Sequence, residues 1–108
     1  MTKQVYFDLT STRQIPGVGF GTYLIDNDQA ADAVFVAFKS GYRHIDTAEG
    51  YRNEVGVGHG IRNAISELGL RRENIFVTTK LWPGNAAWGQ PVKDAAATIR
   101  SLEESLER

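Results

Sequence analysis

The chain has 108 residues, of which 42% are hydrophobic and 23% are charged, the ordinary composition of one soluble globular domain. Twelve basic and thirteen acidic residues give a formal net charge of -1, so the basic surplus of nucleic-acid or anionic-membrane binders is missing. The absence of cysteine excludes disulfides and thiolate metal sites, and no apolar run approaches the ~20 residues of a membrane span. We expect a cytoplasmic protein with neither a nucleic-acid nor a membrane partner.

The N-terminal part predicts a hairpin followed by a glycine-rich strand. Val5–Leu9 alternates in polarity, and a polar turn separates it from a second strand that opens at Ile15, which indicates a hairpin. Gly17–Tyr23 alternates glycine with apolar residues, which is typical of a strand whose backbone is closely approached. Thr22 stands where a dinucleotide-binding fingerprint needs its third glycine, so the pattern argues against a Rossmann domain.

Three strand–helix units are predicted after the hairpin. The first helix is capped within Asp26–Asp28 and stops at Gly41. The later elements are a strand at 42–45 that stops at Asp46 and Thr47, a helix at 53–68, a strand at 75–82 and an amphipathic helix opened by Pro91. This order predicts the α/β class: an N-terminal β-hairpin plus three βα units of a (β/α)8 TIM barrel, incomplete in this chain. A doubly wound sheet has the same local pattern and stays an alternative.

The second predicted helix contains three glycines in its first turns. Gly56, Gly58 and Gly60 each cost about 1 kcal/mol relative to alanine, so they need a reason. Close helix–strand packing is the reason we favour, and approach of a ligand to the backbone is the alternative. His59 has Asn63, not a second ligand, four residues further on, so we predict no metal site.

Three residues of matching chemistry are predicted to meet at one edge of the sheet. Asp46 and Lys80 end consecutive strands, where parallel sheets bind ligands, and Tyr51 follows in the turn after Asp46. An ammonium beside a phenol favours its ionised form, and such a tyrosine can protonate a carbonyl oxygen that gains charge. The hypothesis is Tyr51 as general acid, Lys80 as its tuner and Asp46 as the anchor of Lys80. The alternative is a loop cap, a rim aromatic and a solvated lysine with no joint role.

Three separated motifs, covering nearly the whole chain in the right order, resemble those of the aldo-keto reductase family. They are Gly41–Ala48 with Tyr51, Asn53, Glu54, Val57 and Gly58, similar to the family's first signature; Ile15–Pro16 with Gly19–Tyr23, similar to its first barrel strand; and Ile75–Trp82, similar to its third-strand lysine motif. Family members are NADPH-dependent (β/α)8 barrels that reduce aldehydes and ketones, with a hairpin closing the barrel bottom. The resemblance therefore implies the cofactor NADPH and a small-molecule carbonyl substrate.

The resemblance also implies roles for individual residues. Asp46, Tyr51 and Lys80 match three members of the family's catalytic tetrad. The positions that match the nicotinamide site are Gly21, Thr22, Tyr23 and Asp46. The positions that match the wall of the substrate pocket are Tyr23, Tyr51 and Trp82.

Some features depart from the family pattern. Glu49–Gly50 stands where the family more often has an amide or a small residue, and we expect this to alter the pocket mouth but not the tetrad spacing. The family's catalytic histidine ends the fourth strand, and neither His44 nor His59 has a matching position.

The motif for the cofactor's 2′-phosphate lies in the second half of the family barrel. Most of the NADPH site is therefore expected outside this chain, and residues 1–108 are expected to be one truncated domain without activity of its own. Two alternatives stay open: a non-catalytic fragment that self-associates through open sheet edges, and a family member with a structural or regulatory task.

Overall fold

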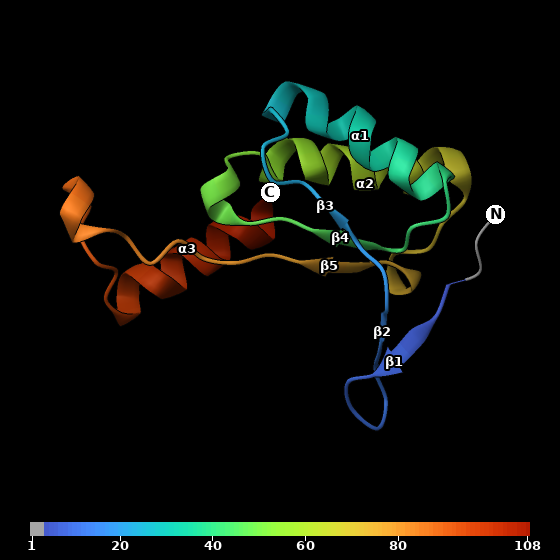
Figure 1. Cartoon of the computed structure of the whole chain (residues 1–108), viewed down its shortest axis with the longest axis horizontal. Coiled ribbons are helices and arrows are strands. Elements are labelled where there is room, and N and C mark those ends of the chain that lie inside the picture. Colours follow the sequence, from blue (N-terminus) through green and yellow to red (C-terminus); the bar gives the residue numbers. More distant parts are fainter. Residues whose placement is uncertain (1–3) are drawn as a thin grey trace.

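A computed structural model describes residues 4–108 as a hairpin, a three-stranded parallel sheet and three helices (Figure 1). The hairpin pairs β1 (Tyr6–Asp8) with β2 (Gln14–Pro16) in antiparallel fashion. The parallel sheet has the order β3–β4–β5, formed by Phe20–Gly21, His44–Asp46 and Phe76–Thr78. The helices are α1 (Asn27–Lys39), α2 (Glu54–Leu68) and α3 (Ala95–Glu107). This confirms the predicted hairpin followed by parallel βα units.

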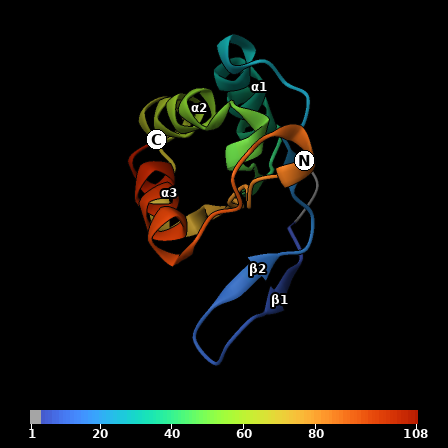
Figure 2. The same cartoon turned by 90° about the vertical axis from the view of Figure 1, so that its left-hand side faces the viewer.

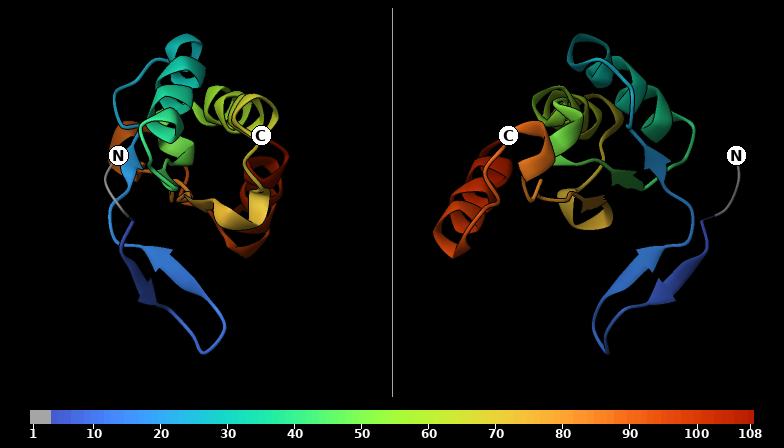
Figure 3. Two further views of the ribbon diagram at one scale, coloured as in Figure 1. Left: turned by 90° about the vertical axis from the view of Figure 1, so that its right-hand side faces the viewer. Right: turned by 60° about the vertical axis from the view of Figure 1, so that its left-hand side comes forward.

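The pleat of the parallel strands separates a helix-covered face from the face that carries the site. Ile45 pairs with Phe20 on β3 and Val77 on β5, and these side chains pack into the core with α1 and α2. The neighbouring register joins Gly21, Asp46 and Thr78; the Asp46 and Thr78 side chains belong to the opposite face, because successive residues of a strand alternate between faces. Figures 2 and 3 show the hairpin projecting away from the two helices. The core thus fixes one face of the sheet and leaves the other for chemistry.

The glycines of α2 have a different partner from the one that the sequence predicted. A Cβ at Gly60 would lie 2.7 Å from the Ala31 carbonyl oxygen and 2.8 Å from the Val34 Cβ, and both neighbours belong to α1. Gly56 likewise faces the Asn27 carbonyl oxygen, also on α1. The prediction of helix–strand packing was therefore wrong: Gly56 and Gly60 let two helices approach. The spacing of the glycines in the sequence predicts close packing at this helix, but it does not indicate whether a strand or another helix is the neighbour.

Replacing Gly60 by alanine is expected to destabilise the chain by up to about 2 kcal/mol. Overpacking typically costs ~1–3 kcal/mol, and alanine recovers only ~1 kcal/mol of helix propensity. Urea unfolding followed by circular dichroism measures the difference. Ser66→Ala, at an exposed position of the same helix, isolates the propensity gain and should stabilise slightly. A Gly60→Ala chain as stable as Ser66→Ala would contradict the helix–helix packing.

The third βα unit begins and ends differently from the prediction. β5 stops at Thr78, four residues before the predicted end at Trp82. The predicted helix start at Pro91 was also wrong, because α3 begins at Ala95. Asp94 is its N-cap, and the Asp94 carboxylate accepts the Ala97 N–H at 2.8 Å. A side-chain cap therefore sets this boundary.

None of the helices within residues 4–108 has the length and apolarity of a membrane-crossing segment.

Candidate active site

The structure brings Asp46, Tyr51 and Lys80 together at the carboxyl edge of the parallel sheet. Asp46 is the last residue of β4, Lys80 lies two residues beyond β5, and Tyr51 ends a short 3-10 helix, Glu49–Tyr51. The Lys80 ammonium forms an ion pair with the Asp46 carboxylate. The same ammonium lies 5.3 Å from the centroid of the Tyr51 ring. The Lys80 ammonium thus forms an ion pair with a carboxylate and lies within cation–π distance of a phenol ring.

The surroundings of Lys80 favour its charged form. Burial acts to lower the pKa of this ammonium, but the hydrogen bond and charge of Asp46, followed by those of Tyr51, raise it above the ordinary value of 10.5. The Lys80 and Asp46 side chains are 47% and 41% exposed, so water screens the pair and its contribution to stability is small. The Lys80–Asp46 pair therefore keeps a positive charge beside the Tyr51 phenol but contributes little to the stability of the fold.

The residues predicted to face a nicotinamide lie beside Asp46. Thr22 donates its backbone N–H and its hydroxyl to the Asp46 carbonyl oxygen, at 3.0 and 3.1 Å, which ties the end of β3 to the end of β4. Thr22 is itself fully buried. Gly21 is exposed, and a Cβ there would meet no atom within 4 Å. Tyr23 is 66% exposed, and the centroid of its ring lies 5.1 Å from that of the Tyr51 ring. An open glycine backbone and an exposed aromatic ring suit a flat, partly apolar group.

Sequence reasoning did not assign the role that Asn53 has in holding these loops. Its amide nitrogen donates to the carbonyl oxygens of Thr22 and Ile25, at 2.8 and 3.0 Å, and its side-chain oxygen accepts the Thr47 hydroxyl at 2.9 Å. Asn53 is 1% exposed and directly precedes α2, but its side chain does not cap that helix. A buried amide therefore joins the segments that follow β3 and β4. In the sequence, the only indication of this role was a polar residue, Asn53, between Tyr51 and the second helix.

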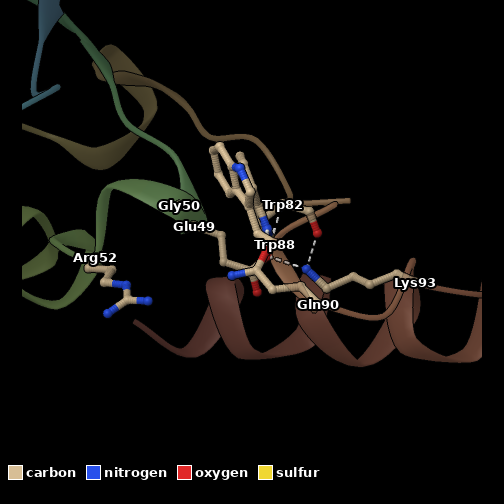
Figure 4. A pocket seen from close by; sticks show the side chains of 7 residues that line it. All are labelled: Glu49, Gly50, Arg52, Trp82, Trp88, Gln90 and Lys93. Atoms are coloured by element: carbon tan, nitrogen blue, oxygen red, sulfur yellow. Dashed lines mark hydrogen bonds and ion pairs between the residues drawn. The ribbon is translucent and has the colours of Figure 1, made fainter. Parts of the chain in front are cut away.

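A second group of residues missed by the sequence surrounds Trp82. Glu49, Gly50, Trp82, Trp88, Gln90 and Lys93 line a cavity of about 380 Å³ together with Arg52 (Figure 4). Trp82, predicted to wall the substrate pocket, is 37% exposed, and its ring stacks on Trp88 with centroids 6.1 Å apart. Sequence reasoning identified Glu49 only as a departure from a family pattern and did not single out Lys93.

The Glu49 carboxyl is held in its ionised form. Burial alone would raise its pKa, but hydrogen bonds from Lys93 and from the Trp82 N–H, with the charge of Lys93, lower that pKa below the ordinary 4.5. Because the folded-state pKa is lowered, the stabilisation is present above the unfolded value of 4.5 and is lost as the pH falls through the folded value.

We therefore expect tryptophan emission to change on acidification below pH 4.5, as Glu49 takes up a proton and the contacts around Trp82 loosen. Both tryptophans of the chain, Trp82 and Trp88, lie in this cavity, so emission reports on it directly. The measurement is a fluorescence titration from neutral to acidic pH, with far-ultraviolet circular dichroism to follow global unfolding. Glu49→Gln should remove the step that precedes unfolding. An unchanged profile in that variant would contradict the assignment.

Within residues 4–108, no three His, Asp or Glu side chains gather into a group that could hold a metal ion.

Comparison with known proteins identifies the fold first and then the family. A crystal structure of a Bombyx mori aldo-keto reductase in complex with NADP superposes with a TM-score of 0.82 and 34% identity, over 99% of this chain and 34% of that protein. The chain thus has the architecture of the N-terminal part of an aldo-keto reductase barrel. Residues 17–108 match the model of the Aldo/keto reductase family, and the chain belongs to that family.

Curated relatives show the same partial coverage. An NADH-dependent D-xylose reductase of Candida parapsilosis is 51% identical over 74 residues, which are 68% of this chain and 23% of that protein. Aldose reductase C of Dictyostelium discoideum is 40% identical over 97 residues, 89% of this chain and 30% of that protein. The chain therefore spans between a fifth and a third of the length of these relatives.

Proposed function

We propose that this chain is the N-terminal part of an NADPH-dependent reductase that converts aldehydes and ketones to alcohols. The observation that carries the proposal is the Lys80 ammonium, which pairs with the Asp46 carboxylate and lies over the Tyr51 ring. Asp46 ends β4, and Tyr51 and Lys80 lie in the segments that follow β4 and β5, so the three residues lie at the carboxyl edge of the parallel sheet, where barrel enzymes have their active sites. The names of relatives, among them xylose and aldose reductases, support this class of substrate.

The chemistry divides between the cofactor and the residues of this chain. NADPH, when bound, would supply the hydride for the carbonyl carbon. Tyr51 donates its phenolic proton to the carbonyl oxygen as that oxygen gains charge, and Lys80 stabilises the phenolate that remains. Asp46 holds the Lys80 ammonium in place through their ion pair. In this mechanism Tyr51 transfers one proton, and Lys80 and Asp46 stabilise the charge that the transfer leaves on Tyr51.

Neither histidine of the chain takes part in this site. His44 Nε2 lies 2.8 Å from the Thr78 hydroxyl, and His59 Nδ1 lies 3.2 Å from a guanidinium nitrogen of Arg62. The proposal therefore places the histidine of the family tetrad, and most of the NADPH site, outside residues 1–108. Gly21, Thr22, Tyr23 and Asp46 would contact the nicotinamide end, and Tyr23, Tyr51 and Trp82 would wall the carbonyl pocket.

Joining residues 1–108 to the remaining two-thirds of the Bombyx mori enzyme tests the proposal. We expect this hybrid barrel to oxidise NADPH in the presence of an aromatic aldehyde, and the isolated chain to show negligible oxidation. Circular dichroism and NADPH fluorescence establish that the hybrid folds and binds cofactor, and the intact Bombyx mori enzyme is the positive control. A folded hybrid that binds NADPH but does not turn over aldehyde would contradict the proposed function. Turnover by the isolated chain would contradict its expected inactivity.

A non-catalytic function, self-association of the isolated chain, has one observation in its favour. Large apolar side chains are exposed on the hairpin and on α3, namely Val5, Phe7, Leu9, Ile99, Leu102 and Leu106. The uncovered edge of β5 adds unpaired backbone groups that another chain can bind. Light scattering that shows a stable, folded monomer would count against this alternative. A structural or regulatory family member, in contrast, would form a hybrid barrel without turnover.

A further inference from the structure

Glu49 and Lys93 form a partly buried ion pair that the proposed chemistry does not use. Their charged atoms lie 2.7 Å apart, although 44 residues separate them in sequence. The side chains are 17% and 19% exposed, against 58% and 74% for the surface pair Glu73 and Arg71. A pair so shielded from water costs more to break than a surface pair, because either partner alone would be an uncompensated charge. It joins the loop after β4 to the loop after β5.

Both polar groups of the Trp82 backbone end on this pair. The Trp82 N–H donates to Glu49 Oε1 at 2.8 Å, and the Lys93 ammonium donates to the Trp82 carbonyl oxygen. The backbone N–H of Glu49 also donates to the Lys80 carbonyl oxygen at 2.8 Å. Glu49 therefore hydrogen-bonds the segment after β5 on both sides of Leu81, at the candidate catalytic Lys80 and at Trp82.

The Trp82 ring is fixed from three further directions. Its indole N–H donates to the Gln90 side-chain oxygen at 2.7 Å, and its face stacks on Trp88 with an interplanar angle of 15°. On the Gly50 side a Cβ would already lie 3.3 Å from the Trp82 ring, so a larger residue at position 50 would press on it. Figure 4 shows these side chains converging on one cavity, with Lys93 reaching from the start of the α3 segment. The ring is held by the two loops that the Glu49–Lys93 pair joins.

We propose that Glu49 and Lys93 are positioning residues that hold Trp82 and so adapt the substrate pocket to carbonyl compounds with a flat apolar group. This inference rests on the proposed function, which makes Trp82 a wall of the pocket. The Trp82 backbone is held at its N–H and carbonyl oxygen, and its indole is held at the ring nitrogen, so the ring is a rigid surface. A rigid surface binds a flat apolar group at a lower entropic cost. A small aldehyde without such a group does not use that surface.

The first experiment uses the 108-residue chain and needs no activity. The only tryptophans, Trp82 and Trp88, are 37% and 70% exposed, so the less accessible fraction of the emission in an acrylamide quenching titration reports on how tightly Trp82 is held. Lys93→Met removes the ammonium and should increase the quenching, whereas Lys93→Arg keeps the charge and should restore most of the protection. Glu73→Gln breaks the exposed surface pair and should leave quenching unchanged. Circular dichroism separates local opening from unfolding. Equal quenching in wild type and in a folded Lys93→Met chain would overturn the proposal.

The second experiment measures specificity in the hybrid barrel. Lys93→Met is expected to raise KM for benzaldehyde about tenfold with kcat within a factor of two, and to leave KM for glyceraldehyde unchanged. Equal changes for both aldehydes, or none, would overturn the specificity role. A wild-type hybrid that folds but lacks turnover would refute the proposed function, and with it the specificity role. The quenching experiment would still decide whether the pair holds Trp82.

Discussion

In a complete barrel that carries this chain, Tyr51→Phe is expected to lower kcat for aldehyde reduction by about 10²–10⁴-fold, the range that a positioned general acid supplies. Phenylalanine keeps the ring that lies 5.3 Å from the Lys80 ammonium and 5.1 Å from the Tyr23 ring. The substitution therefore removes only the hydroxyl. Because proton donation occurs in the transition state, kcat and kcat/KM should fall together while KM changes little. Steady-state NADPH oxidation with an aromatic aldehyde measures both.

The matched control is the same chemical change at Tyr42. This ring packs edge-on against Phe20 beside the core, with centroids 5.8 Å apart, so Tyr42→Phe should leave kcat within a factor of about two. NADPH fluorescence should show that both variants bind the cofactor. Lys80→Met should also lower kcat, because the phenolate loses its neighbouring cation. A Tyr51→Phe enzyme with kcat close to that of the wild type would refute the general-acid assignment.

Features decided by neighbouring residues were predictable from the sequence. Helix α2 ends at Leu68, as the sequence predicted, and the next residue, Gly69, has a left-handed φ of 68° that glycine adopts without strain. The proximity of Asp46 and Lys80 followed from chain order, since consecutive βα units usually place their strands side by side. The ion pair between the two residues was then the expected response of a cation beside a carboxylate.

Features that depend on pairings across the fold were not predictable. Asn53 stands where a helix cap is expected, but its amide turns to carbonyl groups that precede it by 31 and 28 residues. The start of α3 was predicted at Pro91, four residues too early. The backbone N–H of Lys93 donates to the Pro83 carbonyl oxygen at 2.8 Å, which keeps Lys93 outside the helix, and Asp94 becomes the cap. In each case several backbone conformations satisfy the local pattern, and a distant hydrogen bond selects among them.

The largest stability effect is expected at the buried amide that joins the loops of the site. Asn53→Ala should lower the free energy of unfolding by about 3–5 kcal/mol, because each buried polar group left without a partner costs ~1–3 kcal/mol. The change would leave the Ile25 carbonyl oxygen and the Thr47 hydroxyl without their Asn53 partner, whereas the Thr22 carbonyl oxygen loses one of two bonds and keeps the Ile25 N–H at 3.1 Å. Urea unfolding followed by circular dichroism measures the loss. Asn63→Ala, the same change at an exposed position of α2, should alter stability by less than about 0.5 kcal/mol.

A chain of this size has roughly 5–15 kcal/mol of stability, so Asn53→Ala can exhaust much of it, and a graded variant is needed. Thr47→Ala removes only the hydrogen bond to the Asn53 side-chain oxygen and should cost about 1 kcal/mol. If the network acts as one unit, Thr47→Ala should cost nothing or recover part of the loss once Asn53 is already alanine, because it then removes a hydroxyl that has lost its partner. Additive losses in that double variant would mean that the two residues act independently. The loops that present Asp46 and Gly21 would then be held by separate contacts, without a shared buried amide at their junction.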